Sequence, residues 1–217
     1  MDISTSEAAI AAGVTEQRVR AMIASGALEA RRVGGRWVIE SRDIDASRRN
    51  GRPMTTRNAW CLLALASGDE VEGVRAEERY RLRKRLARLR DVEDKALVVR
   101  SWLARRADRS EYEASDAAAV ERDERAMRSG LSDARSGLTR SNEAEVYVLA
   151  NHARAFERDH ALFRVQRGMG NIVVHVVADD LASMMRPSAL LTAADLSERS
   201  DERSLSRAAL IIGDERW

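Results

Sequence analysis

Few side chains in this chain of 217 residues have the types and spacing that catalysis or metal binding requires. The three histidines, His152, His160 and His175, are not spaced like the ligand pair of an H-E-x-x-H helix. None of them neighbours the single cysteine, Cys61. One cysteine excludes both an internal disulfide and a multi-cysteine zinc site. A lone histidine within a strand, such as His175, is more often structural than catalytic.

A pair of carboxylates, Asp179 and Asp180, follows the most apolar stretch of the second half. Carboxylates at a strand end can hold a metal ion, but no third carboxylate at a suitable offset and no Gly-Ser phosphate loop accompanies this pair. The start of a loop is therefore the favoured interpretation. The phosphate-loop, nucleophile-elbow and dinucleotide motifs are also absent from the sequence. We predict no catalytic residue, metal site or cofactor, and hence no enzyme.

Arginine is the remaining side chain with useful chemistry here, because a guanidinium binds phosphate. Residues 1–110 hold 23 basic and 16 acidic residues, a net charge of +7, whereas residues 111–217 hold 14 and 19, a net charge of −5. The whole chain carries only +2. This division predicts two kinds of partner, a polyanion for the basic half and a protein or second copy for the acidic half.

Two short helices are expected to position the first basic residues. Ser6 is a candidate N-cap for a helix that ends at Gly13, a residue that permits a sharp turn. Thr15 is the candidate N-cap of a second helix over 15–25. In that helix the apolar side chains share one face at spacings of three and four, and Gly26 follows as its C-terminal residue.

A β-hairpin and a linker follow these helices in the sequence. Segments 28–32 and 36–40 are predicted strands around Gly34 and Gly35, a hairpin signal with arginines on both sides. A third short helix is expected from Asp43. Residues 47–53 are charged and rich in turn formers, which indicates a linker, placed at 49–56.

The order and spacing of these signals resemble the helix-turn-helix of the excisionase and MerR-like group over about residues 3–48. The shared features are the G-V-T turn, the S-G-x-L helix end and the V-G-G-R-W hairpin. The resemblance implies that the second helix enters the major groove and that the hairpin is a wing. It places Thr15, Gln17, Arg18, Arg20 and Ala21 at reading or phosphate-contacting positions, and Arg31, Arg32 and Arg36 in the wing. Glu16 departs from the group, which often has Arg or Ser there, and would repel phosphates or accept from cytosine N4. Trp37 is expected to be a core aromatic residue.

The middle of the chain predicts three helices, one of them strongly basic. Thr55 or Thr56 caps a helix that reaches Gly68, and another helix is expected over 96–107. Between them, a helix over 77–90 has a narrow apolar stripe at Leu82, Leu86 and Leu89. Its cations are Arg79, Arg81, Arg83, Lys84, Arg85, Arg88 and Arg90. These would repel one another unless a polyanion or acidic neighbour is near. The alternatives are a second DNA contact, a contact with the acidic half, and a plain solvated face.

The second half is predicted to be a small α/β domain. A strand at 111–114 and a helix from Asp116 to about residue 128 are followed by strands at 160–167 and 171–177. Gly168 to Gly170 are expected to join these two strands as a β-hairpin. The run 172–177 is β-branched and nearly continuous, which is typical of a central strand covered on both faces. A helix over 201–212 closes the chain.

Short motifs in this half resemble the C-terminal part of AbiEi-type antitoxins and related actinobacterial regulators. They are Glu145-Val146-Tyr147-Val148, the segment from His160-Ala161-Leu162 through Gly170-Asn171 to Val177, and Asp201-Glu202-Arg203. Such antitoxins combine a winged DNA-binding domain with an α/β domain. They repress the operon that encodes them and a nucleotidyltransferase-like toxin, so the resemblance implies that role here.

Together these observations predict an α+β protein with a winged helix-turn-helix at 1–48, a linker at 49–56, a basic helical segment at 57–110 and an α/β partner or dimerisation domain at 111–217. The expected function is a cytoplasmic, nucleoid-associated, sequence-specific DNA-binding regulator, the antitoxin or autorepressor of a toxin-antitoxin or defence locus. Its partners would be double-stranded operator DNA and, through the acidic half, a toxin or a second copy, with no membrane. The alternatives are an excisionase-like architectural factor that acts with a recombinase, and a protein-interaction module.

Overall fold

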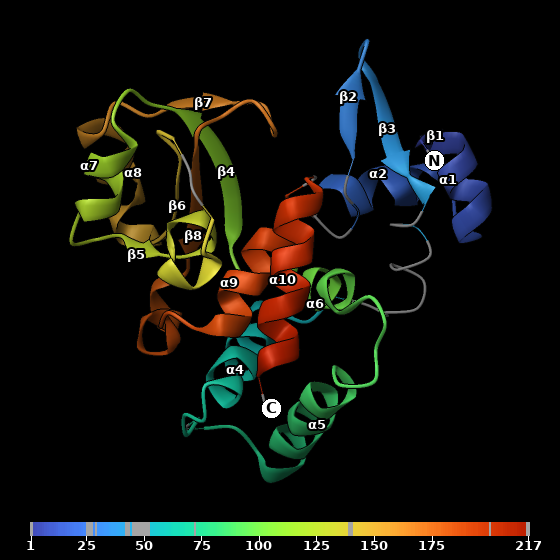
Figure 1. Cartoon of the computed structure of the whole chain (residues 1–217), viewed down its shortest axis with the longest axis horizontal. Coiled ribbons are helices and arrows are strands. Elements are labelled where there is room, and N and C mark those ends of the chain that lie inside the picture. The colour runs from blue at the N-terminus through green and yellow to red at the C-terminus, as the bar shows by residue number, and fades with distance from the viewer. Residues whose placement is uncertain are drawn as a thin grey trace.

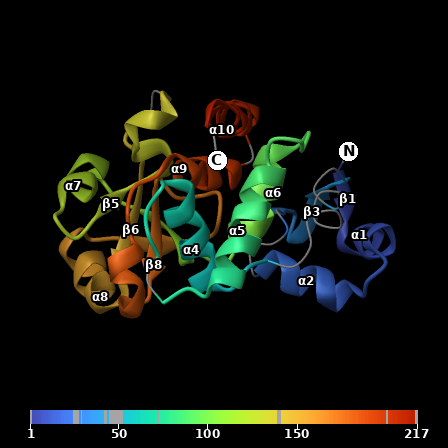
Figure 2. The same cartoon turned by 90° about the horizontal axis from the view of Figure 1, so that it is seen from below.

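The computed structural model describes residues 2–24, 28, 30–41, 44, 53–71, 73–138, 141–199 and 201–215. Its elements confirm the mixed α+β class, with a small N-terminal sheet and a larger sheet in the second half (Figure 1). Among the described residues, no helix combines the length and apolar character that crossing a bilayer demands. Figures 1 and 2 place the N-terminal elements at one end of the long axis and the larger sheet toward the other.

The N-terminal unit contains two helices and a three-stranded sheet. The elements are β1 (Asp2–Ser4), α1 (Thr5–Ala12), α2 (Glu16–Ala24), β2 (Arg31–Val33) and β3 (Arg36–Glu40). The sheet order is β1-β3-β2 and both pairings are antiparallel. Ile3, Ala8, Val19, Leu28 and Ile39 belong to a core that is separate from the other clusters of the described residues. This unit therefore has an apolar core of its own.

Local signals explain where these helices begin and turn. Ser4, not Ser6 as predicted, caps α1: its hydroxyl accepts from the Glu7 backbone N–H, and the Glu7 carboxylate accepts from the Ser4 backbone N–H at 2.8 Å. The prediction was wrong because it overlooked this reciprocal capping box.

The predicted turn residues agree better with the structure. Thr15 caps α2, since its hydroxyl accepts from the Arg18 N–H at 3.2 Å. Gly34 and Gly35 have φ values of 57° and 80°, which the hairpin turn requires of both residues. Trp37 packs against the N-terminal core, as expected. The predictions for Gly26, for the helix from Asp43 and for the first half of the linker lie outside the described residues.

Three helices follow, close to the predicted positions. They are α4 (Thr56–Ala66), α5 (Ala76–Arg88) and α6 (Lys95–Leu103). Thr55 is the cap of α4. Leu82, Leu86 and Leu89 are buried as the stripe predicted, whereas α6 ends at Leu103, before the end expected near Arg105 and Arg106.

The second half builds a five-stranded mixed sheet with the order β5-β6-β8-β4-β7. Its strands are β4 (Asp108–Glu113), β5 (Met127–Arg128), β6 (Ala144–Leu149), β7 (Phe163–Val165) and β8 (Ile172–Val177). The β6–β8 pair is parallel and the other pairs are antiparallel. The central position of β8 is confirmed: β6 and β4 flank it, and residues on both of its faces are buried.

The predicted β-hairpin across Gly168 to Gly170 is wrong. β4 lies between β7 and β8 and pairs with both, so the two strands are not hydrogen-bonded to each other. The first strand is also shorter than predicted: residues 150–159 form a helix, and the left-handed backbone of Ala161 (φ 47°) precedes the strand. Local sequence cannot report that a distant strand enters between two sequence neighbours.

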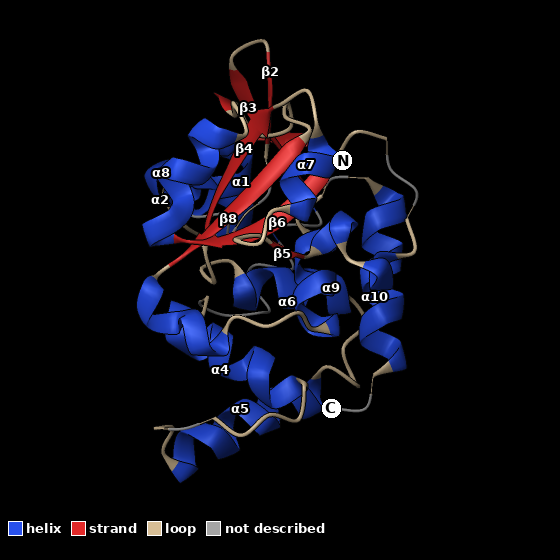
Figure 3. Ribbon diagram, turned by 90° about the vertical axis from the view of Figure 1, so that its left-hand side faces the viewer, coloured by secondary structure: helices blue, strands red, loops and turns tan. Residues whose placement is uncertain are grey.

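Four helices surround this sheet: α7 (Ala117–Arg122), α8 (Ala150–Asp159), α9 (Ala189–Ser197) and α10 (Glu202–Asp214). The helix predicted from Asp116 ends at Arg122, because the chain turns extended at Asp123 and then forms β5. α7 and α8 cover one face of the sheet, where Phe156 joins the valines of β6 and β8. On the other face lie α6, α9 and α10 (Figure 3).

The largest core joins the middle of the chain to its end. Trp60 and Leu62 of α4, Leu103 of α6, Leu191 of α9 and Ile212 of α10 belong to one buried cluster. The core is therefore continuous across residue 110, where composition alone suggested a boundary. The domain limits given above stay predictions.

Candidate functional site

The outer face of α2 carries every reading position that the resemblance implied. The residues Thr15, Gln17, Arg18, Arg20 and Ala21 are all exposed. Val19 and Ile23 point the other way and are 0% and 9% exposed. The helix thus packs through one apolar stripe and leaves a polar face with two guanidiniums open.

Glu16, which differs from the helix-turn-helix pattern that the sequence resembles, makes contacts within the protein. Its carboxylate lies 3.3 Å from the Arg20 guanidinium, one helical turn away, and accepts a hydrogen bond from the Thr5 hydroxyl at 3.4 Å. Because the Arg20 guanidinium is positively charged, this ion pair partly neutralises the charge of Glu16. Arg18 makes no ion pair with any described residue.

The arginines of the β2–β3 hairpin are exposed at its edges. Arg31 pairs with Asp2 of β1, and the Arg32 guanidinium lies 4.9 Å from the Trp37 ring centroid. Arg36, beside the Gly34-Gly35 turn, is exposed. The two contacts hold the long side chains along the hairpin without burying their charge.

α5 presents a second basic surface, only part of which is open to solvent. The exposed cations are Arg81, Arg83, Lys84 and Arg88. Arg79 is half-buried and donates to the Val74 carbonyl at 3.4 Å, and Arg85 lies 5.4 Å from the Trp102 ring centroid. Burial, together with the nearby Arg88 charge, lowers the pKa of Arg85. Two of the predicted contact residues therefore also serve packing.

The two basic surfaces are far apart. Figures 1 and 3 both place α5 at the opposite end of the molecule from the β2–β3 hairpin.

The side chains considered for catalysis are separated in the fold. Cys61 is fully buried in the main core, and this burial raises the pKa of its thiol. His152 is exposed on α8, while His160 contacts Asp123 at 2.8 Å. The pair that begins at Asp179 opens a short 3₁₀ segment (Asp179–Met184), where Asp179 accepts from the Asn151 N–H at 3.0 Å. These groups form no common site.

His175 differs, because the sheet register brings polar residues of three strands to its side. Tyr147 of β6 and Arg109 of β4 are its direct partners across the sheet. Glu145 and Glu111 lie two residues along the same strands and so share that face. The Tyr147 and His175 rings stack with centroids 4.4 Å apart. The alternate residues of β6 and β8 are apolar and face α7 and α8.

Arg106 and α9 close this polar cluster from the other side. The Arg106 guanidinium is 2% exposed, forms ion pairs with Asp195 and Glu198, and donates to the Tyr147 hydroxyl at 2.6 Å. Tyr147 in turn donates to Asp195 at 2.7 Å. The Trp60 indole donates to the Arg106 carbonyl at 2.8 Å, which fixes the backbone at this point.

Burial and charge shift the ionisation of these groups in opposite directions. Burial opposes the charged form of Arg106, but the Glu198, Tyr147 and Asp195 neighbours outweigh it and raise its pKa. Burial raises the pKa of Glu145 and of Asp195. It lowers the pKa of His175 to about 4, so the imidazole is neutral at pH 7.

A cleft of about 540 Å³ opens beside this cluster, toward the N-terminal unit. Ala24 of α2 lies on its rim, and His175 and Glu198 line its inner part. Its basic residues are Arg105, Arg106, Arg109, Arg164 and Arg167. The cluster was missed from sequence, although a signal was present: Glu145 and His175 are polar residues inside otherwise apolar strands.

Comparison with known proteins adds no relative: no family model, curated protein or solved structure matches this chain.

Proposed function

We propose that the chain is a sequence-specific DNA-binding transcriptional regulator, with residues 3–48 acting as a winged helix-turn-helix. The observation that carries the proposal is the division of α2. Its apolar stripe packs into the N-terminal core, whereas Thr15, Gln17, Arg18 and Arg20 are exposed to solvent. A recognition helix needs this combination, because it must be fixed by its inner face and read base edges with its outer face.

The β2–β3 hairpin supports the same proposal as a wing. Its arginines are exposed at the edge of the sheet, and Arg36 follows a tight glycine turn that places it near the tip. Guanidiniums in this position bind the phosphate backbone, which supplies affinity without sequence information. In this proposal α2 gives specificity and the hairpin gives affinity.

The α5 surface would add contacts to the backbone. Four exposed cations on one helix attract phosphates of any sequence, so their removal should weaken all DNA alike. The larger C-terminal part would then bind a protein partner or a second copy. This arrangement fits the antitoxin or autorepressor of a toxin-antitoxin or defence locus.

The experiment is a binding titration with duplex from upstream of the gene, against a scrambled duplex, at several salt concentrations. Replacement of Arg18 and Arg20 by alanine should remove about 1–3 kcal/mol of discrimination for each base that is no longer read, roughly 5- to 150-fold. Replacement of Arg81, Arg83 and Lys84 by alanine should lower both affinities equally and reduce the salt slope by about 0.9 for each phosphate that these cations neutralise. Arg154→Ala/Arg203→Ala, at two exposed positions of the acidic half, is the matched control.

The results distinguish the candidate functions. An equal drop in affinity for both duplexes in the α2 variant would refute the recognition-helix assignment. Footprints over a promoter palindrome support a regulator, whereas tandem repeats at an attachment site would indicate an architectural factor. Absence of any complex at low salt would instead favour a protein-interaction module.

A further inference from the structure

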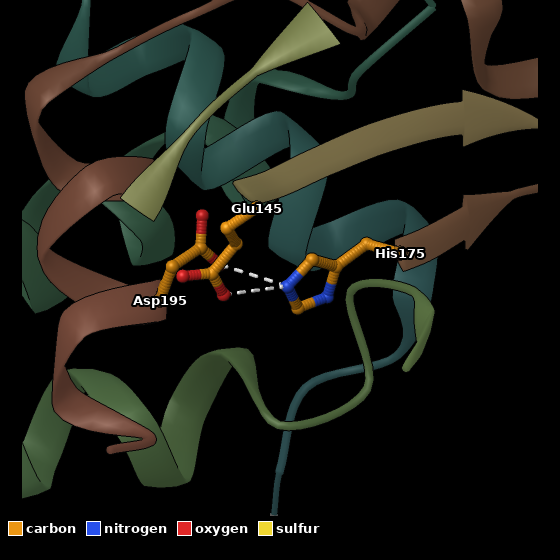
Figure 4. Close-up of side chains that lie close together, drawn as sticks. All are labelled: Glu145, His175 and Asp195. Atoms are coloured by element: carbon orange, nitrogen blue, oxygen red, sulfur yellow. Dashed lines mark hydrogen bonds and ion pairs between the residues drawn. The ribbon is translucent and has the colours of Figure 1, made fainter. Parts of the chain in front are cut away.

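Three buried side chains from separate elements converge on one point of the polar cluster. They are Glu145 of β6, His175 of β8 and Asp195 of α9, which are 1%, 1% and 0% exposed (Figure 4). Each offers one ligand atom, and these atoms lie within 4.8 Å of one another. We propose that this triad binds one divalent transition-metal ion, of the class of Zn²⁺ or Mn²⁺, independently of the DNA contact.

The distances suit such an ion. His175 Nε2 lies 3.0 Å from Glu145 Oε1 and 3.7 Å from Asp195 Oδ1. Ligand atoms about 2.1 Å from a metal at tetrahedral or octahedral angles are separated by roughly 3.0–3.4 Å. The His175–Glu145 separation already lies in this range, and the His175–Asp195 separation would have to shorten by a few tenths of an ångström. Figure 4 shows the imidazole nitrogen directed at both carboxylates, as coordination requires.

A second observation points to a missing ligand. Glu145 Oε2 is buried and has no hydrogen-bond partner, although a buried carboxylate oxygen without one is costly. The Glu145 side chain is wholly enclosed, and a Cβ added at Gly130 would overlap its Oε2. If the carboxylate rotated when an ion binds, Oε2, which has no partner within the protein, could become a ligand of that ion.

The charges of the cluster leave room for a cation. Its carboxylates are Glu111, Glu145, Asp195 and Glu198, and its guanidiniums are Arg106 and Arg109. Arg167, at the rim of the cleft, lies 3.9 Å from Glu198 and adds one more positive charge. Four carboxylates therefore face two guanidiniums inside the cluster, while Arg105, Arg164 and Arg167 line the cleft outside it. A divalent ion would add positive charge among these carboxylates.

Neighbouring groups already orient the candidate ligands. Asp195 accepts hydrogen bonds from Arg106, Tyr147 and Ser129, which fix its carboxylate. Outer-shell donors of this kind are typical of metal ligands. His175 and Arg106 both line the arginine-rich cleft beside the triad. One imidazole with two carboxylates favours zinc or manganese over magnesium, which prefers oxygen ligands only.

The test is metal binding by the untagged full chain after removal of metals with EDTA. Equilibrium dialysis against Zn²⁺ or Mn²⁺ should give one ion per chain, and the spectrum of bound Mn²⁺ should show coupling to one imidazole nitrogen. His175→Asn and Glu145→Gln should each lower affinity more than about 100-fold, since outer-shell changes alone cost 10- to 100-fold. The matched controls His152→Asn and Glu113→Gln replace exposed residues and should bind as the unaltered chain does.

A second measurement covers the case in which the buried variants do not fold. In ¹⁵N-histidine-labelled wild-type protein, Zn²⁺ should shift the His175 signal alone, identified by its persistence in His152→Asn and His160→Asn. The proposal is overturned if no ion binds stoichiometrically, if a folded His175→Asn retains full affinity, or if the shifted signal belongs to His152 or His160.

Discussion

The buried Arg106 allows the sharpest test of how the large core is held together. We consider Arg106→Met, which keeps an unbranched side chain and removes the charged guanidinium. Asp195 and Glu198, 0% and 7% exposed, would no longer be paired with this guanidinium. Removing one partner of a buried pair costs about 3–5 kcal/mol because the other charge stays buried. Arg109 still contacts Glu198 at 3.2 Å, so the destabilisation should concentrate on Asp195.

The assay is urea unfolding in EDTA, followed by tryptophan fluorescence, since Trp60 adjoins the network through its bond to the Arg106 carbonyl. The double variant Arg106→Met/Asp195→Asn removes the uncompensated charge and should recover about 1–3 kcal/mol relative to additivity. Arg105→Met, at the exposed neighbouring position, is the control and should change stability by less than about 0.5 kcal/mol. A destabilisation at Arg106 equal to that at Arg105, or strict additivity of the double variant, would refute this account of the network.

Two further predictions concern local geometry and pH. Gly130→Ala should destabilise more than Gly137→Ala: both have positive φ, 53° and 60°, a strain of about 1–2 kcal/mol for alanine, but only at 130 would the new methyl overlap the Glu145 carboxylate. Equal unfolding free energies of the two variants would contradict this. Hydrogen bonds from Arg125 hold the pKa of Asp123 well below its usual 3.8. The ionised Asp123 carboxylate therefore stabilises the folded protein fully above pH 3.8, and this stabilisation is lost as the pH falls further. The difference in unfolding free energy between the wild-type protein and Asp123→Asn should shrink below pH 3.8, and urea midpoints at pH 3 and pH 6 would measure it.

Local structure could be predicted closely from the sequence where the interactions that form it lie within one short segment. Thr15 and Thr55 cap helices because their own hydroxyls accept from N–H groups three residues on. The glycines at 34 and 35 set the hairpin turn, and the β-branched run of β8 forms a buried strand. Each of these predictions rests on interactions or preferences within a few residues.

Other elements lacked such a signal. Helix α9 is buried throughout, so its sequence shows no polar face and no helical period. β1 spans three residues and exists only because β3 pairs with it. The order of β7, β4 and β8 depends on a strand fifty residues earlier in the chain. The local sequence pattern of a strand does not indicate which distant strand it pairs with.

The candidate sites divide in the same way. The exposed face of α2, which carries the residues proposed to read DNA, could be predicted from the sequence, because the helical period separates the buried face from the exposed one. The cluster of Glu145, His175 and Asp195 could not, because its members lie 20 or more residues apart along the chain and meet only through strand register and the packing of α9. By itself, the sequence determined local conformation and the polarity of each face. Only the tertiary structure decided which buried charges meet, since that depends on pairings that short-range preferences do not encode.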